Sequence, residues 1–113
     1  METKFNFNSQ VCTDKVQSER LLALGLKKET ADCIHFHTKE KGWEILVLEE
    51  GDTAKYVEGF EIPAWSLHRL IEMVAHTQYP YYVISKELPI YDALCERIAW
   101  LIKEGYFNKE YLV

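Results

Sequence analysis

The feature that most constrains the fold is a change of hydrophobic period along the chain. Over residues 33–48, apolar side chains alternate with polar ones or run together in short stretches, which is typical of β-strands. Over residues 63–76 and again over 88–104, apolar side chains recur at every third or fourth position, which is typical of amphipathic helices. A chain that carries both patterns is expected to pair its strands into a sheet and to cover that sheet with helices.

The strand region is typical of a hairpin. Ile34 and Phe36 share one face of its first strand, and residues 38–42 form the loop, where Gly42 can adopt a positive φ. The return strand, residues 43–48, is apolar on both faces. That pattern predicts a strand sandwiched between two layers.

The order of elements predicts an α+β fold. The sheet is small and mainly antiparallel, made of the hairpin at about 33–48 plus one or two short strands, and about three helices cover it. Residues 1–11 are expected to be a flexible arm or an added edge strand, and residues 12–113 a single globular domain. The other predicted elements are a helix from Thr13 and Asp14 to Gly25, a strand over 56–62 interrupted at Gly59, a helix from Pro63 to about residue 76, a β-prone run over 81–84, and a helix from about Leu88 to Gly105.

Composition excludes several classes of protein. Eighteen acidic against thirteen basic residues give a net charge of −5, which disfavours binding to nucleic acid or to an anionic membrane surface. The longest apolar run, residues 45–48, is far shorter than the ~20 residues that span a bilayer. No signal peptide is visible, and three scattered cysteines without C-x-x-C spacing fit a reducing compartment. We therefore expect a cytoplasmic protein with no membrane partner.

Three segments of the chain resemble a known group of proteins. They are QSERLLALGL at residues 17–26 with TAD at 30–32, PAWSL at 63–67 with Leu70, and WLIKEGY at 100–106. In this order they resemble small uncharacterised proteins found in prophages and mobile elements of gut bacteria. The resemblance implies an intracellular setting and an accessory role in a mobile element. It implies no reaction and no catalytic residue.

The sharpest candidate for a metal site is Cys33, His35 and His37. Alternate residues of a strand project to the same side, so these three groups would stand about 6 to 7 Å apart in a row. Zinc needs ligands that converge on one centre, which a straight strand supplies poorly. The alternative is that they form the polar face of a hairpin strand whose apolar face is Ile34 and Phe36.

A second candidate set is His68, Glu72 and His76, spaced by four along the predicted helix. Residues four apart are neighbours on a helix surface, so each pair could chelate an ion or share a hydrogen bond. The set lacks the H-E-x-x-H arrangement of metalloproteases. The alternative is a solvated helix face opposite Leu70 and Val74.

No nucleophile or cofactor site is marked out by the sequence. Cys95 lies in the apolar stripe of the last helix, where burial is expected to raise its pKa and make the thiol inert. The five glycines are isolated, so no phosphate-binding loop is present. We predict no cofactor and no catalytic residue.

Two tryptophans depart from the apolar stripes of their predicted helices. Trp100 falls opposite the stripe of the last helix, and Trp65 falls on the polar side of the preceding one. Large aromatic side chains outside a core stripe are either covered by other parts of the chain or form a binding surface. The covering segments would be the N-terminal arm or the C-terminal aromatics Tyr106, Phe107 and Tyr111.

These observations favour a non-enzymatic protein-interaction module of a phage or mobile element, which binds through Trp65 and Trp100. Its partner would be another protein or a second copy of the chain. The alternative is a small metal-dependent enzyme that uses one of the Cys/His or His/Glu clusters. A third hypothesis is a phage structural or anti-host factor that occupies the surface of another protein, which has the same physical basis as the first.

Overall fold

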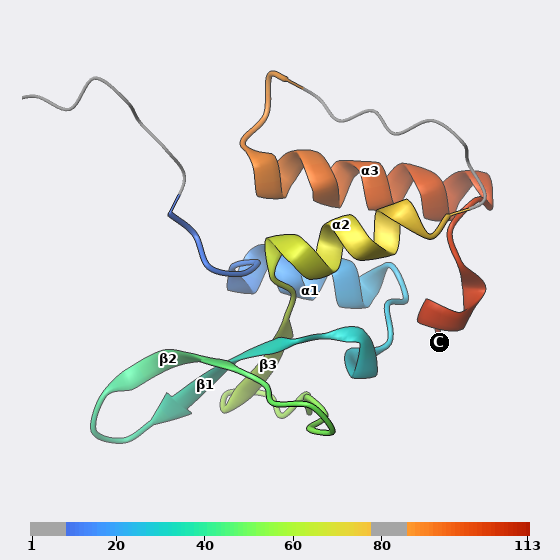
Figure 1. Ribbon diagram of the computed structural model, residues 1–113. Coiled ribbons are helices and arrows are strands. Elements are labelled where there is room, and N and C mark those ends of the chain that lie inside the picture. Colours follow the sequence, from blue (N-terminus) through green and yellow to red (C-terminus); the bar gives the residue numbers. More distant parts are fainter. Residues whose placement is uncertain (1–8, 78–85) are drawn as a thin grey trace, which may run out of the picture.

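The computed structural model describes residues 9–77 and 86–113, in which three helices accompany a three-stranded antiparallel sheet (Figure 1). The α+β class predicted from the sequence is confirmed. The predicted β-prone run at 81–84 and residues 1–8 of the predicted arm lie outside the described residues. The elements are α1 Lys15–Ala23, the short 3-10 helix η1 Lys28–Thr30, β1 Cys33–Thr38, β2 Gly42–Val47, β3 Glu61–Ala64, α2 Leu67–Ala75, α3 Ile90–Glu104 and the short 3-10 helix η2 Lys109–Tyr111.

The sheet has the strand order β2-β1-β3, so β1 is central and β2 and β3 are its two edges. In the β1–β2 hairpin, Cys33 opposes Val47 and Thr38 opposes Gly42. Gly42 has a φ of +73°, which a residue with a side chain rarely adopts. The hairpin and the backbone conformation at its turn are as the sequence predicts.

The boundary between the last strand and the second helix differs from the prediction. The sequence pattern places Pro63 in the first turn of a helix, but it belongs to β3 and opposes Ile34 of β1. The amide of His37 donates to the carbonyl of Phe60, and inward and outward residues alternate along an antiparallel ladder. The ring nitrogen of Pro63 therefore faces away from β1, where no donor is needed. The predicted strand over 56–62 is likewise displaced, because only its last two residues belong to β3.

Local capping explains where the first two helices begin. Asp14 Oδ1 accepts from the amide of Gln17, while Gln17 Oε1 accepts from the amide of Asp14, which forms a capping box at the start of α1. At the end of this helix, Gly25 takes the predicted positive φ, +105°. The α2 helix begins after Ser66, whose hydroxyl accepts from the amide of Arg69 at 3.2 Å.

The hydrophobic core lies among the three helices rather than over the whole sheet. Figure 1 shows α1, α2 and α3 stacked at one end of the molecule, with the β1–β2 hairpin extending away from them. Of the three strands, only β1 contributes a buried residue, Ile34, to this main cluster. The helical, loop and C-terminal members that are fully or almost fully buried include Leu21, Trp65, Leu70, Leu94, Ile98, Leu101 and Phe107. Within residues 9–77 and 86–113, this placement leaves β2 without a covering layer.

Candidate functional site

The three candidate metal ligands of β1 do not share one environment. Cys33 and His35 are buried, whereas His37 is exposed and packs edge-on against the Trp43 ring, with ring centroids 5.3 Å apart. His35 Nε2 lies 2.7 Å from the carbonyl oxygen of Thr13. Because a carbonyl oxygen only accepts, Nε2 carries the proton and donates, so this nitrogen has no lone pair for a metal.

Cys12 joins this region, although no spacing in the sequence pointed to it. Its Sγ lies 3.9 Å from His35 Nε2, and it is buried together with Cys33 and Ala64. The pKa of Cys33 is raised well above its usual range. The largest cause is the hydrogen bond between the Cys33 and Cys12 thiols, and the second is the burial of Cys33. The Cys33 thiol is therefore protonated at neutral pH, and His35 Nε2, already a donor, cannot act as a base toward Cys12.

The residues of the second candidate set, on and just after α2, also lie in different surroundings. His68 is an exposed residue of α2, and Glu72 Oε1 lies 3.2 Å from Arg69 Nε. His76 terminates the helix, with its Nδ1 3.4 Å from the hydroxyl of Tyr111 near the C-terminus. Glu72 and His76 thus each have a partner outside the candidate set.

A pocket of about 310 Å³ beside α2 holds two of these residues, Glu72 and His76. The Arg69 guanidinium in this pocket already donates to the carbonyl of Thr30 at 2.6 Å and pairs with Glu72. Across residues 9–77 and 86–113, no group of three or more His, Cys, Asp or Glu side chains is arranged to hold a metal ion. The remaining residues that line the pocket are Glu29, Met73 and Tyr111.

Trp65 lies inside the protein and not on the polar side of a helix. Its side chain is fully buried, and it precedes α2 rather than belonging to that helix. The indole Nε1 donates to Thr30 Oγ1 at 2.9 Å, and the backbone amide donates to Thr13 Oγ1 at 3.1 Å. The outward position predicted for Trp65 is wrong, because the predicted helix includes residues that form the end of β3. Trp65 therefore offers no surface to a partner.

Trp100 remains partly accessible on α3. Its side chain is 36% exposed, and Tyr106 stacks against it with a centroid separation of 5.8 Å. The guanidinium of Arg97 lies 4.7 Å from the centre of the indole ring. Tyr106 and Arg97 therefore cover parts of the Trp100 ring, and the remainder stays accessible to solvent.

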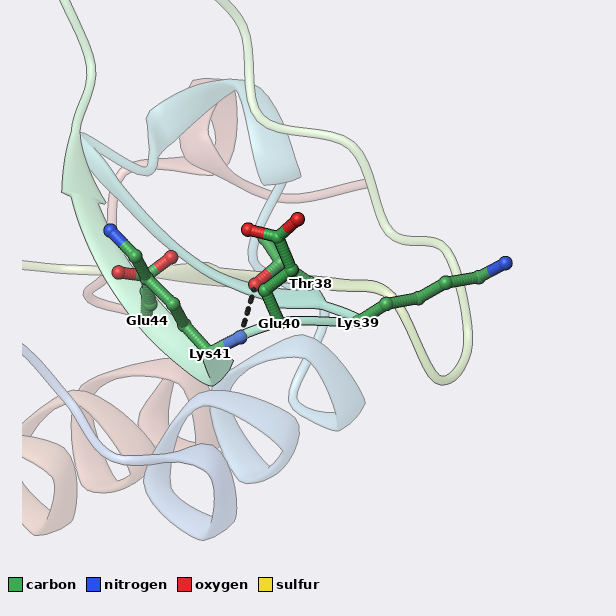
Figure 2. A pocket seen from close by; sticks show the side chains of 5 residues that line it. All are labelled: Thr38, Lys39, Glu40, Lys41 and Glu44. Atoms are coloured by element: carbon green, nitrogen blue, oxygen red, sulfur yellow. Dashed lines mark hydrogen bonds between the residues drawn. The ribbon is translucent and has the colours of Figure 1, made fainter.

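A second pocket, of about 390 Å³, lies at the turn of the β1–β2 hairpin. Figure 2 shows Lys39 directed away from the other charged side chains and Lys41 and Glu44 extending to the same side, with the amide of Lys41 donating to Thr38 Oγ1 at 3.1 Å. Lys39, Glu40 and Lys41 are all exposed. This surface is an open, charged end of the hairpin, and Glu44 of β2 is one of its lining residues.

The most exposed apolar segment of the sheet is β2, which the sequence pattern did not mark as a surface. The fractions of surface exposed are 48% for Ile45, 50% for Leu46 and 60% for Val47. The prediction that this strand is sandwiched between layers is wrong, because the helices pack against each other and against β1 and β3. Apolar residues on both faces of β2 therefore remain in contact with water.

The outer side of the β2 backbone pairs with no other strand of the described residues. The amide of Leu48 donates to the carbonyl of Asp32 at 2.9 Å, which places this pair among the hydrogen-bonded pairs of the ladder. Because such pairs alternate, the amide and carbonyl groups of Trp43, Ile45 and Val47 point away from β1. We call the side chains of Ile45, Leu46 and Val47, together with these outward backbone groups, the β2 surface.

The opposite edge of the sheet is protected in two ways. Pro63 directs a ring without an N–H toward the outside of β3, which blunts an edge. At the end of this strand, the amide of Thr13 donates to the carbonyl of Trp65 at 2.9 Å, and Cys12 forms a bridge with Ser66. Within the described part of the chain, the two edges of one sheet therefore differ: β3 is capped and β2 is open.

Comparisons with protein-family models, with curated proteins and with solved structures find no significant match to this chain. Among the described residues, no helix has both the length and the apolar character needed to cross a membrane. The arrangement of the molecule itself is therefore the basis of the functional proposal.

Proposed function

We propose that this chain is a non-enzymatic protein-interaction module that binds its partner through the β2 surface. The observation that carries the proposal is a run of three exposed apolar residues on an edge strand whose outward backbone groups pair with no described strand. Long exposed apolar edges favour aggregation, and natural proteins usually cover or charge them. A partner that covers this edge accounts for both its apolar side chains and its open backbone.

Addition of an extended segment from the partner is the binding mode that suits an open edge. Main-chain hydrogen bonds from Trp43, Ile45 and Val47 would supply affinity that depends little on the partner's sequence. Ile45 and Val47 project to one face of the sheet and Leu46 to the other, so the partner meets apolar side chains on both faces. Burying the exposed half of each side chain contributes on the order of 1 kcal/mol per residue.

The proposal places the module in the cytoplasm, as an accessory protein of a prophage or mobile element. Support comes from three buried cysteines that carry free thiols and from the resemblance described above. The net charge of −5 favours a protein partner over nucleic acid. Trp100 on α3 and Tyr106, two residues after the end of that helix, form a second, smaller contact surface. Figure 1 shows α3 on the side of the helices that is turned away from the hairpin.

Site-specific photo-crosslinking in the organism that encodes the chain tests this function. A photoreactive amino acid replaces Leu46 in one variant and Val16 in the control, because Val16 is also an exposed apolar residue but lies on α1. We expect discrete protein adducts at position 46 that are absent at position 16. Equal adduct patterns at the two positions, or no adduct at either, would overturn the assignment of the β2 surface as a docking site.

A further inference from the structure

The β2 surface is complementary to itself, and we propose that its partner is a second copy of this chain, paired antiparallel with β2 about Ile45. This inference rests on the proposed function, since it names the partner of the same surface. Three features support it: the direction of the backbone groups, the side chains that would meet, and the charges at the two ends of the strand.

When two copies of an edge strand pair antiparallel about a two-fold axis, the residue on the axis opposes its own copy. That residue sets the register, because residues equally far before and after it then oppose each other across the interface. With Ile45 on the axis, Trp43 opposes Val47 of the second copy, and Gly42 opposes Leu48. The residues with outward backbone groups, Trp43, Ile45 and Val47, then face one another and form hydrogen-bonded pairs. Each outward group in this stretch gains a partner.

The charges at the ends of the strand fit this register. With Ile45 on the axis, Lys41 opposes Glu49 of the second copy, and the symmetry repeats this opposite-charge pair at the other end. Both residues are exposed, so their side chains can reach across the new pair of strands. The dimer therefore carries two Lys41–Glu49 pairs, which flank a centre where Trp43 meets Val47 and Glu44 meets Leu46. One residue further out, Glu40 opposes Glu50, so the charge complementarity is confined to the Lys41–Glu49 pairs.

Neighbouring registers lack the Lys41–Glu49 pair. With Leu46 on the axis, Trp43 would oppose Glu49, and Lys41 would oppose Gly51, which carries no side chain. With Glu44 on the axis, two carboxylates would oppose each other directly. Of these three registers, the one about Ile45 alone places Lys41 opposite an acidic side chain, and it sets no two carboxylates against each other within β2.

Pairing in this register also closes the open edge of the sheet. It joins two copies of the β2-β1-β3 order into one continuous sheet whose outer edges are both β3. Those edges carry Pro63, which stops further strand addition. The assembly is thus a closed dimer and not a growing fibre.

Charge exchange across the interface tests the proposal on the full chain by sedimentation equilibrium. Lys41→Glu places two like-charged pairs in the homodimer, and Glu49→Lys does the same with the opposite sign. We expect each variant to dimerise more weakly than the unsubstituted chain, with a dissociation constant raised roughly tenfold or more. An equimolar mixture of the two variants is expected to dimerise more tightly than either variant alone. At one end of the mixed dimer the unsubstituted Lys41 and Glu49 oppose each other, and at the other end the two substituted positions form an opposite-charge pair.

The matched control is Lys39→Glu, an exposed charge reversal in the same loop that would oppose Gly51 in this register. It is expected to dimerise like the unsubstituted chain. A dimer that ignores the exchange at 41 and 49, or that responds equally to Lys39→Glu, overturns pairing about Ile45. Circular dichroism of each variant confirms that the exposed substitutions leave the fold intact.

The outcome also separates this inference from the proposed function. A chain that stays monomeric up to millimolar concentration overturns self-pairing, while an adduct of the position-46 probe with a different protein leaves the docking role in place. An adduct within one chain, to its own residues 1–8, overturns self-pairing and assigns the edge to that segment. A monomer without any adduct at position 46 refutes both proposals.

Discussion

Replacing Thr13 with valine tests the hydrogen-bonded junction that joins α1 to the end of β3. Thr13 is fully buried, and its Oγ1 accepts from the backbone amide of Trp65 at 3.1 Å. The same oxygen lies 2.7 Å from the hydroxyl of Ser18 in α1. Valine has nearly the same shape as threonine, so Thr13→Val removes these interactions while it keeps most of the packing.

The expected loss of stability follows from the groups left without partners. A buried amide that loses its acceptor costs about 1–3 kcal/mol, and a lost hydroxyl–hydroxyl bond costs about 0.5–1.5 kcal/mol. Ser18 Oγ keeps a weaker contact with the Thr13 carbonyl at 3.4 Å, which limits the second loss. We expect Thr13→Val to lower the free energy of unfolding by about 2–4 kcal/mol, and to lower Tm by about 8 to 16 °C.

Urea unfolding followed by circular dichroism measures this change, with Thr53→Val as the control, because Thr53 is exposed and undergoes the same chemical substitution. The control is expected to change stability by less than about 0.5 kcal/mol. A Thr13→Val protein within that same margin of the unsubstituted chain would refute the reasoning, because the junction would then contribute no net stability.

Three further predictions concern single side chains. Burial raises the pKa of Cys95 to about 12, so its thiol should resist alkylation at pH 8 in the folded protein and react on unfolding in urea; rapid labelling of the native state, read by mass spectrometry, contradicts its burial. A hydrogen bond from Arg20 lowers the pKa of Glu96, so this exposed pair contributes stability above the unfolded-state pKa of a glutamate and loses it as pH falls through the folded-state value. Glu96→Gln should therefore lower the free energy of unfolding slightly at pH 7 and leave it unchanged near pH 2, as read by urea unfolding at the two pH values, and a larger loss in acid than at pH 7 contradicts this sign. Trp100→Glu should leave the melting temperature nearly unchanged because the ring is partly exposed, whereas loss of partner capture in the same variant would assign Trp100 to a contact surface.

Local features of this chain followed from residues close together in sequence. Asp14 and Gln17 form the capping box at the start of α1, and Gly25 and Gly42 take the positive φ values that their places at a helix end and a hairpin turn require. These conformations depend on interactions within a few residues, so the local sequence contains the information needed.

The segment around Pro63 shows where local sequence is insufficient. A proline suits both the first turn of a helix and an outward position on an edge strand. Pairing with β1, which lies almost thirty residues away, selects the strand and places Pro63 opposite Ile34. Because the sequence pattern assigns Pro63 to a helix, it also predicts that Trp65 lies on the polar side of that helix. In the structure Trp65 is a core residue whose indole donates to Thr30.

The β2 surface shows most clearly which features depend on local sequence and which depend on tertiary packing. The hairpin loop and the β-branched residues that follow it predicted a return strand over residues 43–48, close to β2, and the apolar character of both its faces is evident from the residue types alone. Only the tertiary structure decided that Ile45, Leu46 and Val47 stay exposed, because the three helices bury their apolar stripes mainly against one another and none of these three side chains joins the buried core. Whether an apolar face is covered depends on where distant elements pack, and the period of a single strand carries no information about that.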